Sequence, residues 1–355
     1  MDPLRVGDPR QVGVYQLVNR LGDGGMGQVF FGISPGGRPV AVKVIRPEFA
    51  ADPEFRRRFA REVDAARRVG GFHTAHVVAA DPYDDPPWMV TAYIAGPSLQ
   101  AVVTGDGPLA PAEVARLGAA LTEGLAAIHL NGLVHRDLKP GNIIMADDGP
   151  RIIDFGIAQA AGATSLTTPG TVIGTYSFMS PEQVRADSVT PESDVFSLGC
   201  VLAYAATGRP PFDAPNGAAI IYRVLNEQPD LDDLPPGVLR DTVRACLAKE
   251  PERRPLSSDL LARFAVGLRD RPATRASEIL VADTPSEPAL PAVLAEEAVP
   301  GVLAPPGVPA PEAEAQREQV LPERHGNVTI TQEANAAPNS VVIQIAGNAR
   351  IGDDT

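Results

Sequence analysis

Residues 135–142 of this 355-residue chain read His135-Arg136-Asp137-Leu138-Lys139-Pro140-Gly141-Asn142, and they are its most informative stretch. Asp137 can accept the proton of a hydroxyl group, and Lys139, two residues later, can neutralise a transferred phosphoryl group. Asn142 offers a neutral oxygen to a hard cation such as Mg²⁺. The tripeptide Asp154-Phe155-Gly156 follows a short β-prone run and adds a charged metal ligand. Together the two motifs indicate phosphoryl transfer that depends on a divalent cation.

A glycine cluster near the N-terminus reads Gly22-Asp23-Gly24-Gly25-Met26-Gly27-Gln28-Val29 and fits the pattern G-x-G-x-x-G-x-V. Glycines let the backbone close over phosphates and direct its N–H groups toward them. Because a second strand and not a helix is predicted after the cluster, a β-hairpin lid is favoured over a dinucleotide-binding turn. The next strand carries Lys43, and Glu62 on the following helix is its candidate partner. An exposed position for Glu62 stays open, since Arg58 and Arg61 lie close to it in sequence.

Composition limits the classes of partner and location. The formal net charge of −13 argues against a nucleic-acid or anionic-membrane surface. The two cysteines, Cys200 and Cys246, are too few for a disulfide-stapled secreted framework and too far apart for a zinc cluster. No run of about 18 apolar residues is present, and the N-terminus lacks the apolar core of a signal peptide. We therefore expect a cytoplasmic protein with no transmembrane segment and no nucleic-acid partner.

The chain divides into four parts by composition. Residues 1–14 form an N-terminal lead, and residues 15–268 carry the alternating hydrophobic and turn signals of a folded domain. Residues 269–325 are rich in Pro, Ala and Glu, and we interpret them as a disordered linker. From residue 272 to the end there are 11 Pro and no Phe, Trp or Tyr, which is too little apolar surface to offset chain entropy. Residues 326–355 form a short β-prone tail.

Within residues 15–268 the first part is rich in predicted strands and the second part in predicted helices. Strand patterns cover residues 14–18, 28–33 and 39–45, and helix patterns cover residues 53–69, the region from Pro111 onward and residues 195–206. The last of these helices is almost entirely apolar, which predicts a buried position. The sequence therefore predicts an α+β fold in which a small strand-rich lobe precedes a larger helical lobe.

The tail contains a repeat. Gly326-Asn327-Val328-Thr329-Ile330 recurs as Gly347-Asn348-Ala349-Arg350-Ile351, and residues 340–345 between the copies are strongly β-prone. Two such segments could stack as rungs of a self-associating β motif, which loosely resembles the amyloid-like signalling motifs of some microbial immune and cell-death proteins. The alternatives are a strand that docks on a partner's sheet edge and an inert disordered tail. The role of residues 326–351 is thus an open hypothesis.

With its motifs taken together, the chain resembles the eukaryotic-like (Hanks-type) Ser/Thr protein kinases of bacteria, and its composition is actinobacterial in style. The resemblance covers residues 15–268 and is supported by three further segments: Ser180-Pro181-Glu182, Asp194–Gly199 and Glu250–Pro255. It implies the bilobal protein-kinase fold, with a small β-rich N-lobe and a large helical C-lobe, followed by a disordered C-terminal tail. It also implies a structural ion pair between Arg254 and Glu182.

The resemblance implies the roles of the catalytic residues. Asp137 is the expected catalytic base, and Lys139 is expected to contact the γ-phosphate of ATP. Thr175 is expected to bond both of these side chains and to shape the substrate pocket. Lys43 is expected to hold the α- and β-phosphates and to pair with Glu62.

The nucleotide and metal sites follow from the same resemblance. Asn142 and Asp154 are the expected ligands of Mg²⁺, with Mn²⁺ as an alternative. Thr91 falls at the gatekeeper position beside the adenine, and the backbone of the hinge is expected to bond the base. The other expected ATP-binding positions are Leu21, Gly22, Gly24, Gly27, Val29, Ala41, Ala92, Ile94 and Ile144.

The expected reaction transfers the γ-phosphoryl group of ATP to Ser or Thr hydroxyls of proteins, because tyrosine kinases of the family usually differ at the position of Lys139. Arg136 is expected to await a phosphate on the activation segment, although an ordinary flexible loop is the alternative interpretation. The candidate acceptors there are Thr164, Ser165, Thr167, Thr168 and Thr171, of which Thr167 and Thr168 match best in position. A pseudokinase and a kinase-fold enzyme acting on small molecules are the alternative functions. Both are less favoured, because no catalytic group is lost and the activation segment is typical of a protein-substrate platform.

Overall fold

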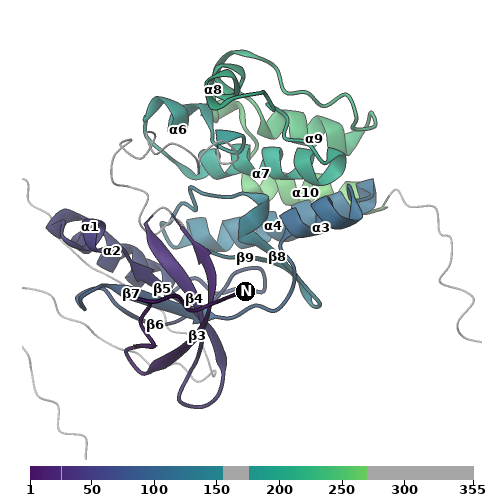
Figure 1. Cartoon of the computed structure of the whole chain (residues 1–355). Helices are drawn as coiled ribbons and strands as arrows, with labels where there is room; N and C mark the ends of the chain where they lie inside the picture. Colours follow the sequence, from purple (N-terminus) through teal and green to yellow (C-terminus); the bar gives the residue numbers. More distant parts are fainter. Residues whose placement is uncertain (25, 155–175, 270–355) are drawn as a thin grey trace, which may run out of the picture. The chain divides into compact units, whose positions relative to one another are not determined.

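The computed structural model describes residues 1–24, 26–154 and 176–269, and all of them belong to one compact unit, Met1–Val281. Their course is shown in Figure 1. Apart from Arg269, the predicted linker and the predicted tail lie outside the described residues. What the sequence predicts for those two segments therefore stays a prediction.

An antiparallel sheet occupies the first part of the chain. Its strands are β1 (Asp2–Pro3), β2 (Gln11–Val12), β3 (Tyr15–Asp23), β4 (Gly27–Ile33), β5 (Pro39–Ile45), β6 (Val77–Asp81) and β7 (Trp88–Ala92). The strand order is β1-β3-β4-β5-β7-β6, and β2 also pairs with β3. Helices α1 (Pro47–Ala50) and α2 (Pro53–Ala66) follow β5 and lie together at one side of the sheet in Figure 1.

The sequence of β5 shows why this sheet forms and which of its two faces stays partly accessible. Successive side chains on a strand point to opposite faces. The side chains of Val40, Val42 and Val44 are buried, whereas those of Ala41 and Lys43 are only half-buried. The buried row packs into a small core with Tyr15, Leu17, Phe30, Trp88 and Val90. Ala41 and Lys43 thus belong to the other face.

Helix α2 has a clear start signal and an apolar stripe. Asp52 caps its N-terminus by accepting a hydrogen bond of 2.8 Å from the backbone N–H of Glu54. Phe55 and Phe59 are buried one turn apart with their rings stacked, and they belong to the larger core of the unit. The same packing fixes the face on which Glu62 lies.

Helices dominate the second part of the chain. They are α3 (Leu99–Asp106), α4 (Pro111–Leu130), α6 (Pro181–Arg185), α7 (Pro191–Thr207), α8 (Gly217–Asn226), α9 (Val238–Cys246) and α10 (Ser257–Arg269), with short 3₁₀ turns at Pro140–Asn142 and Pro251–Arg253 and a hairpin of β8 (Ile143–Ala146) and β9 (Gly149–Ile152). Helix α7 is buried along most of its length, as predicted, and it contacts α4 and α9. The four helices α4, α7, α9 and α10 form one packed group (Figure 1).

Two glycines allow the close approach of these helices. A Cβ atom on Gly199 of α7 would lie 2.8 Å from the Cβ of Cys246 on α9. A Cβ atom on Gly118 of α4 would lie 2.6 Å from the ring of Phe264 on α10. Both contacts are too short for a side chain, so the helix spacing depends on glycine at these positions.

The N-terminal lead, residues 1–14, forms part of the sheet, which the sequence did not predict. Residues 1–14 were expected to precede the folded domain, but β1 pairs with β3 at Asp2–Arg20 and β2 pairs with β3 at Val12–Tyr15. The lead therefore extends the sheet, because β3 has an edge whose backbone groups would otherwise lack strand partners.

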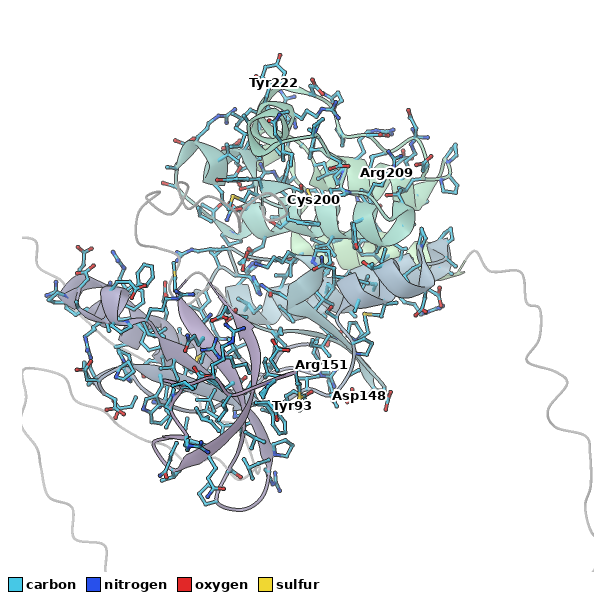
Figure 2. The ribbon with its side chains drawn as sticks, in the orientation of Figure 1. Tyr93, Asp148, Arg151, Cys200, Arg209 and Tyr222 are labelled. Atoms are coloured by element: carbon cyan, nitrogen blue, oxygen red, sulfur yellow. The ribbon has the colours of Figure 1, made fainter. Side chains whose placement is uncertain are left out.

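Two other expectations concern cysteines and membranes. Cys200, labelled in Figure 2, and Cys246 are both buried free thiols. In the described part of the chain, no helix combines the length and the apolar character needed to cross a bilayer.

Candidate active site

The half-buried face of the sheet brings together several predicted nucleotide-binding residues. Val29 of β4 lies opposite Lys43 of β5 in the strand register, and Thr91 of β7 lies opposite Ala41. Directly opposed residues on neighbouring strands point to the same face. Val29, Ala41, Lys43 and Thr91 therefore lie on one face of the sheet, where the small side chains surround a single ammonium group.

The predicted hinge connects this patch to the β8–β9 hairpin. Ala92 ends β7 and donates its backbone N–H to the carbonyl of His76 at 2.9 Å. Ile94 follows in the connection to α3 and is half-buried. The backbone N–H of Met145 donates to the carbonyl of Pro97 at 2.8 Å, which ties this connection to β8 and places it beside Ile144. The segment that follows the hinge therefore lies beside Ile144, which agrees with the predicted adenine pocket.

The glycine-rich loop, residues 22–27, joins β3 to β4. Its turn is closed by a 2.8 Å hydrogen bond from the N–H of Gly24 to the carbonyl of Gly27. Gly27 is required sterically, because a Cβ atom there would lie 2.4 Å from the carbonyl oxygen of Val44. Gly22 is exposed and Leu21 is half-buried at the start of the loop.

Loop 135–142 is held by one buried carboxylate at the start of α7. Asp194 accepts hydrogen bonds from the backbone N–H groups of His135, at 2.8 Å, and Arg136, at 2.9 Å. The ring of His129 also contacts Asp194, at 2.7 Å. Arg136 has φ = 64°, a left-handed conformation that a non-glycine residue adopts only when its surroundings impose it. The carboxylate of Asp194 supplies that constraint.

The predicted catalytic side chains converge within this loop. The Lys139 ammonium donates to Oδ2 of Asp137 at 2.8 Å. The side-chain amide of Asn142 donates to the backbone carbonyl of Asp137 at 2.8 Å and to its Oδ2 at 3.1 Å. The carboxylate of Asp137 is thereby fixed between a cation and an amide. A base held in this way is preorganised to accept a proton from a hydroxyl group.

Asp154 joins this group from the end of β9. Its carboxylate forms an ion pair with Lys43, although the two residues are 111 positions apart in the sequence. Burial acts to raise the pKa of Asp154, but Lys43, with smaller effects of His135 and Lys139, holds that pKa below its usual value. Asp154 is therefore ionised at neutral pH.

The oxygen atoms of Asn142 and Asp154 fit a hard divalent cation. The backbone N–H of Ile153 donates to the carbonyl of Asn142 at 2.9 Å, which fixes the two candidate ligands relative to each other. Because the Asn142 amide nitrogen already bonds Asp137, its side-chain oxygen is the free end. One amide oxygen and one ionised carboxylate are ligands of the kind that Mg²⁺ accepts, so these two residues would be able to hold it.

The predicted ion pair between Lys43 and Glu62 is not among the contacts of the described residues. Glu62 instead accepts a hydrogen bond from Arg136 at 3.1 Å, while Lys43 pairs with Asp154. Each of the two carboxylates therefore has a cation beside it, which offsets part of the cost of burying a charge. The expected partner of Glu62 was Lys43, but the partner in the structure is Arg136, which lies 74 positions away in the sequence.

Burial of Glu62 makes the stability of the unit depend on pH. Burial raises the pKa of Glu62 to about 7, against the opposing effect of Arg136, and its Oε2 atom is buried without a hydrogen-bond partner among the described residues. The unfolded chain, with the ordinary pKa near 4.5, releases this proton first as the pH rises. Ionisation of Glu62 therefore costs folding stability progressively between these two values.

We expect Glu62→Gln to remove this cost. At about pH 5 the variant and the wild type should have similar free energies of unfolding, and at about pH 8 the variant should be more stable by on the order of 2 kcal/mol. Urea unfolding at the two pH values measures the difference. Glu54→Gln, which removes an exposed carboxylate from the same helix, is the matched control. An equal effect of Glu62→Gln at both pH values would contradict the assignment.

One residue of the site carried no functional signal in the sequence. Gln183 of α6 donates its side-chain amide to the carbonyl of Arg136 at 2.7 Å. Its sequence pattern, three residues after Ser180, indicates a helix cap, and that cap is present. The second hydrogen bond, to a loop 47 positions away, depends on tertiary structure.

The other predicted catalytic residue, Thr175, lies outside the described residues. The same holds for Phe155 and Gly156 and for the candidate phosphorylation sites, which fall within residues 155–175. Their roles stay predictions.

Comparison with known proteins identifies the family. Residues 15–264 match the protein kinase domain family. The chain belongs to the protein kinases. Its kinase domain resembles the "Probable serine/threonine-protein kinase PkwA" of Thermomonospora curvata, with 58% identity over 265 residues that cover 75% of this chain and 36% of that protein. It also resembles the serine/threonine-protein kinase AfsK of Streptomyces coelicolor, with 48% identity over 75% of this chain and 33% of that protein.

A solved structure supports the fold of the kinase domain. The crystal structure of the Mycobacterium tuberculosis PknI kinase domain matches with a TM-score of 0.57 and 26% identity, covering 73% of this chain and 96% of that one. The predicted bilobal kinase fold and the predicted bacterial Hanks-type affiliation are thus confirmed. The chain spans about a third of the length of the curated relatives named above.

Proposed function

We propose that the chain is an ATP-dependent protein kinase that phosphorylates Ser and Thr hydroxyls of proteins. The observation that carries this proposal is the convergence of Lys43, Asp137, Lys139, Asn142 and Asp154, which come from two different parts of the chain, in one connected set of contacts. The names of the similar proteins support it, since both are serine/threonine-protein kinases.

In the proposed mechanism each side chain has one task. Asp137 orients the hydroxyl of the substrate and accepts its proton as the oxygen attacks the γ-phosphorus. Lys139 neutralises the negative charge that spreads over the transferred group, and Lys43 holds the α- and β-phosphates. Asn142 and Asp154 would hold Mg²⁺, or Mn²⁺ in its place. When bound, the cation would neutralise negative charge on the phosphates.

A pseudokinase is the competing function. It requires the loss of a group that transfers or neutralises the phosphoryl unit. Each such group among the described residues is present and contacts another of them, namely Lys43, Asp137, Lys139, Asn142 and Asp154. The active enzyme is therefore the better supported of the two.

The experiment that separates them is a phosphoryl-transfer assay on the full chain. We expect the wild-type protein, first treated with a phosphatase, to incorporate phosphate from ATP in the presence of Mg²⁺. Mass spectrometry should place part of that phosphate within residues 155–175, where it would provide an anion for Arg136. Asp137→Asn should incorporate none above background. A wild-type protein that binds ATP and incorporates no phosphate would establish the pseudokinase instead.

The proposal includes a cytoplasmic location and a role of the tail in assembly. A cytoplasmic location agrees with the need for ATP. Self-association or partner docking through residues 326–351 rests on the repeat in that segment alone. Sedimentation of the full chain and of a chain that ends at residue 325 tests self-association, and affinity capture with the same two chains tests partner docking. Equal results for the two chains in both experiments would show that the tail is inert.

A further inference from the structure

The N-terminal strap, defined here as residues 1–14, is built around one nearly buried ion pair. Asp8 accepts two parallel hydrogen bonds from Arg20 of β3, one of 2.6 Å from Nε and a shorter one from Nη2. Only 3% of the Asp8 side chain and 9% of the Arg20 side chain are exposed. Paired hydrogen bonds of this kind fix both the position and the plane of the guanidinium.

Hydrogen bonds within residues 5–8 also fix the position of Asp8, independently of its contact with Arg20. The backbone N–H of Asp8 donates to the carbonyl of Arg5 at 3.1 Å, and the backbone N–H of Arg5 donates to Oδ2 of Asp8 at 2.7 Å. The strand pairs of β1 and β2 with β3 fasten the strap on both sides of this turn. Asp8 is therefore a fixed anchor rather than a side chain on a loose end.

Arg20 uses its remaining donor atom on the glycine-rich loop. Its Nη1 donates to both carboxylate oxygens of Asp23, at 3.3 and 3.0 Å. Asp23 ends β3 and stands between Gly22 and Gly24, two of the predicted phosphate-binding positions. The guanidinium also lies over the ring of Phe30 on β4, 5.8 Å from its centre, so it contacts both strands of the hairpin.

We propose that Asp8 is a positioning residue for the nucleotide, which acts through Arg20 and Asp23 on the glycine-rich loop. The inference rests on the proposed ATP-dependent function of this loop. A loop of small residues has many conformations, and only those that direct its N–H groups at the phosphates bind well. The apparent dissociation constant rises in inverse proportion to the fraction of molecules in the competent conformation. A fixed anchor at one end of the loop raises that fraction.

The test measures nucleotide binding and turnover separately on the full chain. For Asp8→Asn we expect the KM for ATP, and the dissociation constant of a non-hydrolysable ATP analogue with Mg²⁺, to rise about three- to tenfold, as expected if the competent fraction falls to between a third and a tenth. The kcat should stay within about twofold, because the reacting groups are untouched. Asp23→Asn should give the same result, and the double variant should be no worse than either single variant, because all three break one chain of contacts.

Asp2→Asn is the matched control, since it makes the same substitution at an exposed carboxylate of the same strap. It should leave the affinity for the nucleotide unchanged. A merely structural role for Asp8 would lower the melting temperature and leave both the dissociation constant and the KM at their wild-type values, and this result would overturn the proposal. A wild-type chain that binds the analogue without transferring phosphate would refute the proposed function, yet the comparison of dissociation constants would still decide the role of Asp8.

Discussion

Asp154→Asn is expected to lower kcat for phosphoryl transfer by at least about 10²- to 10³-fold, as the loss of one preorganised charge-stabilising group does in other active sites. The substitution keeps the size of the side chain but removes its charge. It thereby weakens a proposed metal ligand and leaves Lys43 without the carboxylate that holds it. Steady-state phosphorylation at saturating ATP and Mg²⁺ measures the effect.

Asp148→Asn provides the matched control for this variant. Asp148 lies at the tip of the β8–β9 hairpin beside Arg151 (Figure 2). Its side chain is 72% exposed. The same substitution there should leave kcat within about twofold, since exposed ion pairs contribute little. A wild-type rate for a folded Asp154→Asn protein would show that the site has been assigned wrongly. Circular dichroism of both variants confirms that each is folded.

The second large effect concerns stability. Arg254→Ala is expected to lower the free energy of unfolding by about 3–5 kcal/mol, because it leaves the carboxylate of Glu182 buried without its partner. The two side chains form a double hydrogen bond of 2.6 and 2.9 Å, and both are almost completely buried. Although burial acts to raise the pKa of Glu182, Arg254 and the hydroxyl of Ser193 hold it below its ordinary value.

The environment of Arg254 explains why this loss should be so large. All five N–H donors of a guanidinium are used here. Besides Glu182, they reach the backbone carbonyls of Ala248, Lys249 and Glu192. The side chain therefore joins α6, the start of α7 and the segment before the last helix. Removing it breaks contacts among three elements at once.

Arg253→Ala is the control in the neighbouring position, where 76% of the side chain is exposed and the nearest carboxylate lies 3.8 Å away. It should change the free energy of unfolding by no more than about 0.5 kcal/mol. Thermal and urea unfolding of the two variants give the comparison. A cost below about 1 kcal/mol for Arg254→Ala would mean that water reaches Glu182 and replaces the lost partner.

The family, the strand-rich first part and the helical second part of the domain, and the candidate residues of the site could be proposed from the sequence. Asp137, Lys139 and Asn142 lie within six positions, so they belong to one loop and the sequence alone places them close together. The conformation of that loop is held by Asp194, which lies far away in the sequence. The strands and helices follow from apolar periodicity, which depends on local geometry and on burial of one face. The buried face of β5 and the apolar stripe of α2 agree with that pattern.

The partners of the charged side chains in ion pairs depended on the tertiary structure. Glu62 has Arg58 and Arg61 near it in sequence and Arg136 near it only through the fold, and the structure pairs it with Arg136. The strap of residues 1–14 gave no periodic signal, yet Asp8 reaches Arg20 and, through it, Asp23. Sequence patterns report periodicity and side-chain chemistry along one segment. The partner of a buried charge depends instead on distances between segments, because the Coulomb energy falls with separation and grows as water is excluded.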